Sequence, residues 1–170
     1  RNVSVLLGDG TGAFNKTADF PAGGSPQRIA TADLDGDRHP DLVLPITEEN
    51  AVAILFGDGR GGFEEPKLFP VAGGPFMTVV ADFNADARLD VAVGTQTAGS
   101  RRVAGLLGSG SRMFSPASYF GSFASSPTAL GAAPYNRAGQ PDPGRGGGRT
   151  PPPGGRQDCT VAGGGGGPAA

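Results

Sequence analysis

Two copies of one nine-residue acidic loop lie 49 residues apart in this chain of 170 residues. Residues 33–41 read DLDGDRHPD, and residues 82–90 read DFNADARLD. A second motif recurs in step with the loop, as LLGDGTGAF at 6–14, LFGDGRGGF at 55–63 and, in degraded form, LLGSGSRMF at 106–114. A fixed period of about 50 residues predicts a repeat architecture in which each repeat is one structural unit.

Short β-like runs fill each repeat, and no stretch has the apolar spacing of a helix. The Gly-Asp-Gly segments have the chemistry of tight hairpin turns, which require positive φ angles. Four antiparallel strands in each repeat of about 50 residues predict one blade of a β-propeller. The runs expected to be strands are residues 3–7, 28–32, 41–46, 51–56, 63–71, 76–81, 89–94, 103–107 and 114–120.

The predicted fold is therefore all-β, a partial β-propeller of about two full four-stranded blades plus half blades. We expect residues 1–26 to be the outer half of one blade, and 27–75 and 76–126 to be two blades that each carry an acidic loop. Residues 127–142 resemble the degraded start of a further blade. Residues 143–170 are rich in Gly and Pro and have few large apolar side chains. We expect this tail to be disordered, because it buries too little surface to offset the entropy of ordering.

The acidic loops have the donor pattern of a calcium site. Oxygen-bearing side chains stand at loop positions 1, 3, 5 and 9, and position 7 can offer its backbone carbonyl. Calcium takes six to eight oxygen ligands, and alternate residues of a tight loop can point inward together. The predicted ligands are Asp33, Asp35, Asp37, His39 and Asp41 in the first loop, and Asp82, Asn84, Asp86, Arg88 and Asp90 in the second.

Three other interpretations of these loops compete with a calcium site. A solvated Asp-rich turn is common, but it does not explain the same odd-numbered spacing in two loops. An EF-hand requires Gly at position 6 and Glu at position 12, where the first loop has Arg38 and Leu44. Magnesium is possible but prefers fewer protein ligands and more water. Because the first loop offers four carboxylates and the second only three, we expect the first to bind calcium more tightly.

No catalytic constellation is visible in the sequence, so we expect no enzymatic activity. The glycines of residues 8–12 could cradle a phosphate only if a helix followed them, and none is predicted there. His39 is the only histidine and has no nucleophile in its sequence neighbourhood, and the single cysteine, Cys159, excludes an intramolecular disulfide. The net charge of -2 gives no electrostatic reason to expect nucleic acid as a partner. No apolar run approaches the roughly 18 residues that a membrane-spanning helix needs.

The combination of loop and turn, in the same order and phase, resembles the FG-GAP/VCBS repeat family. Members of this family form the blades of the propeller in integrin α-subunit heads and of many bacterial surface and secreted proteins. The resemblance covers about residues 1–126 and implies calcium at the two acidic loops. The chain departs from the family at loop position 6, usually Gly, which is Arg38 and Ala87 here. If that position requires a positive φ, both loops are strained.

The resemblance leads to three functional hypotheses. The first is a calcium-binding propeller module of a secreted or surface bacterial protein, which recognises a protein or a carbohydrate and is completed by further blades. The second is a structural spacer, or a truncated or frameshifted fragment, with no binding role. The third is an accessory part of a secreted hydrolase or lyase. The expected location in the first case is extracellular or at the cell surface.

Overall fold

The computed structural model describes residues 1–96, 101–121, 127–133 and 158–163, and there is no helix among them. None of these residues therefore belongs to a helix able to cross a membrane. The strands are β1 (Asn2–Gly8), β2 (Phe14–Pro21), β3 (Ala30–Ala32), β4 (Asp41–Ile46), β5 (Ala51–Leu55), β6 (Lys67–Pro70), β7 (Pro75–Ala81), β8 (Asp90–Thr95), β9 (Val103–Leu106), β10 (Ser118–Phe120), β11 (Pro127–Ala133) and β12 (Asp158–Gly163).

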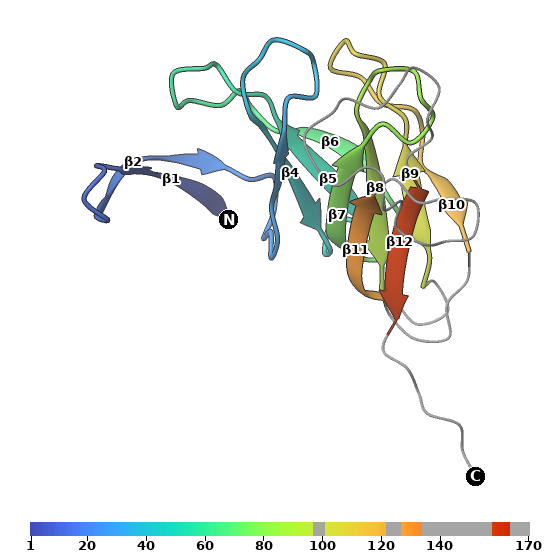
Figure 1. Cartoon of the computed structure of the whole chain (residues 1–170). Helices are drawn as coiled ribbons and strands as arrows, with labels where there is room; N and C mark the ends of the chain where they lie inside the picture. The colour runs from blue at the N-terminus through green and yellow to red at the C-terminus, as the bar shows by residue number, and fades with distance from the viewer. Residues whose placement is uncertain (97–100, 122–126, 134–157, 164–170) are drawn as a thin grey trace.

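Two four-stranded antiparallel sheets form the centre of the molecule (Figure 1). One sheet has the order β3-β4-β5-β6 and the other has the order β10-β9-β8-β7, so sequence neighbours are also neighbours in space. Two two-stranded antiparallel sheets accompany them, β1 with β2 and β11 with β12. The predicted fold class, an all-β partial propeller with four-stranded antiparallel blades, is confirmed. The residue boundaries proposed between blades stay a prediction.

The continuous apolar runs form the most buried strands, because both faces of their sheet are covered. Every residue of β4, β5 and β8 is buried. Side chains alternate between the two faces of a strand. Val43 therefore packs with Val91 and Val93 of the neighbouring sheet. Leu44 points to the other face, into a cluster that Val3 and Phe20 of the β1–β2 hairpin also contact.

The acidic loops and the glycine turns lie together at one end of the two central sheets (top in Figure 1). This end holds the acidic loops, which connect β3 to β4 and β7 to β8, and the glycine turns that follow β5 and β9. Antiparallel strands of similar length place alternate connections at the same end of a sheet, so the topology brings loop and turn side by side.

Several strands differ from their predicted bounds. Residues 63–71 and 114–120 were expected to be strands throughout, but β6 and β10 occupy only their ends. Phe63 and Phe114 form isolated bridges to Gly57 and Gly108 instead. Pro66 and Pro116 lie between bridge and strand and have no N–H to donate to a ladder. The polar strand β2 was not predicted as a separate strand, because its sequence lacks a continuous apolar run.

The structure also differs from the predicted disordered tail at Asp158–Gly163, which form β12 and pair antiparallel with β11. This segment contains Thr160 and Val161, β-branched residues that favour extended backbone. The edge of β11 supplies backbone partners that the sequence did not reveal. The remaining tail residues, and residues 134–142 of the predicted degraded blade, lie outside the described part of the chain.

Candidate metal centre

The first acidic loop brings three predicted ligands together. Asp33, Asp35 and Asp37 each offer one carboxylate oxygen, and these oxygens lie within 4.8 Å of one another. Backbone N–H groups of the loop hold the side chains in place. Asp33 accepts from Gly36 and Arg38 at 2.8 and 2.9 Å, and Asp37 accepts from His39 at 2.8 Å. The bond from His39 is the main reason why the pKa of Asp37 is lowered.

The second loop repeats these backbone contacts with a different side-chain arrangement. Asp82 accepts from the N–H groups of Asp86 and Ala87 at 3.2 and 2.9 Å. Asn84 donates its side-chain amide to Asp86 at 3.1 Å, so one carboxylate oxygen of Asp86 has an internal partner. Among the residues that the structure describes, the 4.8 Å grouping of three acidic side chains occurs at the first loop and not at the second.

The last aspartate of each loop connects the loop to the glycine turn beside it. Asp41 is fully buried and accepts from the N–H groups of Leu34 and Gly57 at 2.8 and 2.9 Å. Asp90, 1% exposed, accepts from Phe83 and Gly108 at 2.9 and 2.8 Å. Burial raises the pKa of both carboxyls, and these hydrogen bonds oppose the rise. Each residue therefore joins two loops, and Asp41 is not part of the grouping of Asp33, Asp35 and Asp37.

Two glycines allow this close approach of loop and turn. A Cβ atom on Gly57 would lie 2.4 Å from the carbonyl oxygen of Pro40, and one on Gly108 would meet the carbonyl oxygen of Leu89. Any side chain at these positions would push the turn away from the acidic loop. The recurring Gly that opens each turn motif is thus explained by contact with the preceding loop.

The residues at loop position 7 keep their side chains outside the acidic grouping. His39 is packed against Gly59 of the glycine turn, and its Nδ1 lies 3.2 Å from Asp37 without forming a hydrogen bond. Arg88 is half exposed and lies 4.0 Å from Asp86. Their backbone carbonyls remain the predicted ligands at this position.

One residue beside the first loop was not predicted from the sequence. Arg112, in the degraded third turn, forms ion pairs with Asp35 and with Glu64. The only sequence signal was that Arg112 replaces a glycine of the repeated turn, since Gly12 and Gly61 occupy the same motif position. The sequence could not show which loop this side chain reaches.

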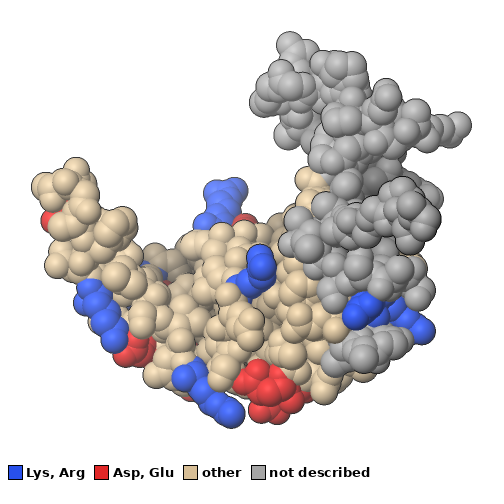
Figure 2. All heavy atoms as spheres, turned by 90° about the horizontal axis from the view of Figure 1, so that it is seen from below, with Lys and Arg blue, Asp and Glu red and all other residues tan. Residues whose placement is uncertain are grey.

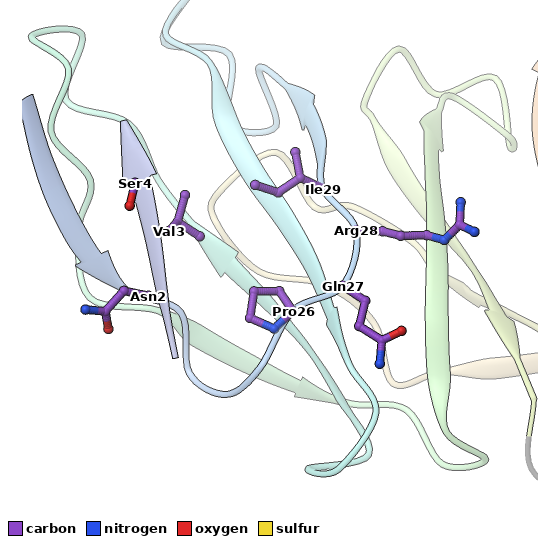
Figure 3. A pocket seen from close by; sticks show the side chains of 7 residues that line it. All are labelled: Asn2, Val3, Ser4, Pro26, Gln27, Arg28 and Ile29. Atoms are coloured by element: carbon purple, nitrogen blue, oxygen red, sulfur yellow. The ribbon is translucent and has the colours of Figure 1, made fainter. Parts of the chain in front are cut away.

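The described surface also has a pocket that is not formed by the acidic loops. A shallow pocket lies between β1 and the segment before β3, lined by residues 2–4 and 26–29 (Figure 3). Arg28 is its one charged lining residue, and no acidic group joins it. On the face seen in Figure 2, acidic and basic side chains are scattered among uncharged residues without a continuous charged patch.

The donor set of the first loop fits a calcium ion. Oxygens that bind calcium lie 2.3–2.6 Å from it, so two ligands of one ion are separated by at most about 5 Å. The spacing of the three aspartate oxygens satisfies this limit. Three carboxylates without nitrogen or sulfur ligands favour a hard cation over zinc or copper.

Comparison with known families agrees with this geometry. Residues 1–44 match a family described as an FG-GAP-like repeat. The match runs from the β1–β2 hairpin through the first acidic loop and into β4. The chain has no match among curated proteins and none among solved structures. Residues 1–44 of this chain are therefore similar to an FG-GAP-like repeat, as the sequence motifs indicated.

Proposed function

We propose that this chain is a calcium-binding β-propeller repeat module of a secreted or surface protein, without catalytic activity of its own. The observation that carries the proposal is the approach of Asp33, Asp35 and Asp37 within 4.8 Å, inside a segment that matches an FG-GAP-like repeat. Three carboxylates this close repel one another unless a cation neutralises them. Calcium bound there would fix the loop end of the sheet.

The residues that would hold the ion are the three grouped aspartates, with the carbonyl of His39 as a further donor. Asp41 contributes by orienting the loop through Leu34 and Gly57. In the second loop, Asp82, Asn84 and Asp86 with the carbonyl of Arg88 form the corresponding set, and Asp90 orients the loop through Phe83 and Gly108. Asp86 must give up its contact with the Asn84 amide to turn toward an ion.

The first test is thermal unfolding of the full chain with excess chelator and with millimolar calcium. A ligand that binds only the folded state adds RT ln(1 + [L]/Kd), which is about 1.4 kcal/mol for each site at ten times the Kd. We expect calcium to raise the midpoint by several degrees. Asp33→Asn should remove much of this rise.

A matched control is Asp9→Asn, which changes an exposed turn aspartate that accepts from Thr11 and lies outside the grouping. This variant should keep the full calcium-dependent rise. An unchanged midpoint in calcium for the unmodified chain would refute the calcium site.

The recognition role is tested separately. The connecting loops at one end of the sheets are the surface proposed to contact a protein or carbohydrate (Figure 1). We expect the chain to bind members of a glycan array, or a surface protein, in calcium and to lose this binding in chelator. Calcium-dependent stabilisation without any such binding would support a structural spacer instead.

A further inference from the structure

Arg112 lies in the third glycine turn but contacts the acidic loop of the other sheet. Its backbone has a φ of 61°, in the left-handed region that the glycines at the equivalent position, Gly12 and Gly61, also occupy. A side chain at this position carries a strain that Gly would avoid. The side chain makes contacts that a glycine at this position could not make.

Those contacts join Arg112 to two carboxylates of the grouped aspartates. Its Nε lies 2.5 Å from Asp35 Oδ2, and its Nη2 lies 3.5 Å from Asp37 Oδ2. The Asp35 side chain is only 6% exposed, so this ion pair is poorly screened by water. The guanidinium is thus the counter-charge of the first loop in the described structure.

Two further contacts keep the guanidinium in place. Nη1 lies 2.5 Å from Glu64 Oε1, and Cζ lies 5.0 Å from the centre of the Phe56 ring. An arginine guanidinium carries its charge at every pH of interest. Arg112 is held from three sides and cannot neutralise itself by losing a proton.

We propose that Arg112 is an internal competitor for the cation of the first loop, an inference that rests on the proposed calcium site. A calcium ion among Asp33, Asp35 and Asp37 takes oxygens that the guanidinium now holds and is repelled by its charge. Binding must release Arg112 from Asp35, so the residue lowers calcium affinity. The bound ion thereby removes an ion pair that connects the two central sheets.

The second loop has no equivalent competitor in the described part of the chain. The second loop has an ion pair between Arg88 and Asp86, which is 4.0 Å long and leaves the Arg88 side chain 51% exposed. Arg112 therefore offsets the advantage that the additional carboxylate gives the first loop. Removing Arg112 should restore the order of affinities that the carboxylate count predicts.

The experiment measures calcium affinity of the first loop by calorimetry on the full chain. The second loop is first disabled with Asp82→Asn and Asp86→Asn. In that background Arg112→Gln removes the charge and keeps a shorter polar side chain, and Arg112→Gly suits the left-handed backbone. Both should bind calcium about tenfold more tightly than the background chain.

Two controls separate this effect from a general change in charge or folding. Arg60→Gln removes an exposed arginine from the preceding turn and should leave the affinity unchanged. With the first loop disabled by Asp33→Asn and Asp37→Asn, Arg112→Gln should leave the affinity of the second loop unchanged. In chelator, Arg112→Gln should lower the melting midpoint, because Asp35 loses its counter-charge, and saturating calcium should reduce that loss.

Unchanged or weaker calcium binding in both Arg112 variants would overturn the inference while leaving the calcium site intact. Equal tightening by Arg60→Gln would also overturn it, since the effect would then be one of net charge. The absence of calcium binding in every variant, including the chain with both loops intact, would overturn the proposed function together with the inference.

Discussion

At the residue scale, position 6 of each acidic loop has the backbone of a glycine without being one. Arg38 has a φ of 70° and Ala87 a φ of 66°, and in the second loop Ala85 has a φ of 63°. From the sequence, both loops are expected to be strained if this position requires a positive φ. Position 6 does have a positive φ in both loops, so both loops are strained. The strain is larger in the second loop, because position 4 is Ala85 there and Gly36 in the first loop.

Replacing Ala87 by Gly should therefore stabilise the chain. Relief of the left-handed strain exceeds the extra entropy that Gly gives to the unfolded chain. We expect a gain of about 0.5–1 kcal/mol in the free energy of unfolding, measured by urea denaturation in chelator. Ala13→Gly is the control, since Ala13 is exposed without a positive φ, and it should be neutral or slightly destabilising. A loss of stability in Ala87→Gly would show that the methyl group makes a contact that outweighs the strain.

At the element scale, the buried aspartates join the acidic loops to the turns that follow β5 and β9. Asp41→Asn keeps the shape of the side chain but places an amide group opposite the N–H of Leu34 or Gly57. Two donors then face each other in a buried site. We expect a loss of about 1–3 kcal/mol in the free energy of unfolding, followed by urea denaturation.

Asp58→Asn is the matched control for this change. Asp58 also accepts two backbone N–H groups, from Arg60 and Gly62, but it is exposed and water can replace a lost partner. Its loss should be well below that of Asp41→Asn. Equal losses would mean that the connection between loop and turn contributes nothing beyond an ordinary surface hydrogen bond.

The strands show which structural information the sequence contains. β4 has the bounds that the sequence predicts, because Asp41 closes the acidic loop and an apolar run follows it at once. β12 was missed, since its short β-branched run stands in a segment dominated by Gly and Pro. Position 9 of the loop was predicted as a metal ligand from its oxygen, but its burial against Gly57 depends on the fold. Arg112 was missed for the same reason, as its partner Asp35 is 77 residues away.

At the scale of the whole molecule, two kinds of contact connect the two central sheets. The ion pair of Arg112 with Asp35 connects them at their loop end, and apolar side chains pack between their strands. Val43 and Val91 belong to one buried cluster, and Arg112 spans the same two sheets above it. Calcium at the first loop would break the ion pair of Arg112 and leave the apolar packing between the strands unchanged. Calcium-dependent changes should therefore be greatest at the loops and small within β4, β5 and β8.

The β1–β2 hairpin gives the last prediction, which concerns association of the chain on its own. β1 pairs with β2 alone among the described strands, so its other edge has free backbone groups. Leu6 and Leu7 are 52% and 56% exposed beside that edge. An unpaired edge with large apolar side chains is a template for pairing with another chain. We expect the mass from light scattering to rise with protein concentration, and Leu6→Lys with Leu7→Lys to reduce this rise. Asn15→Lys, a change at an exposed position of β2, should have little effect, and a stable monomer at every concentration would contradict the prediction.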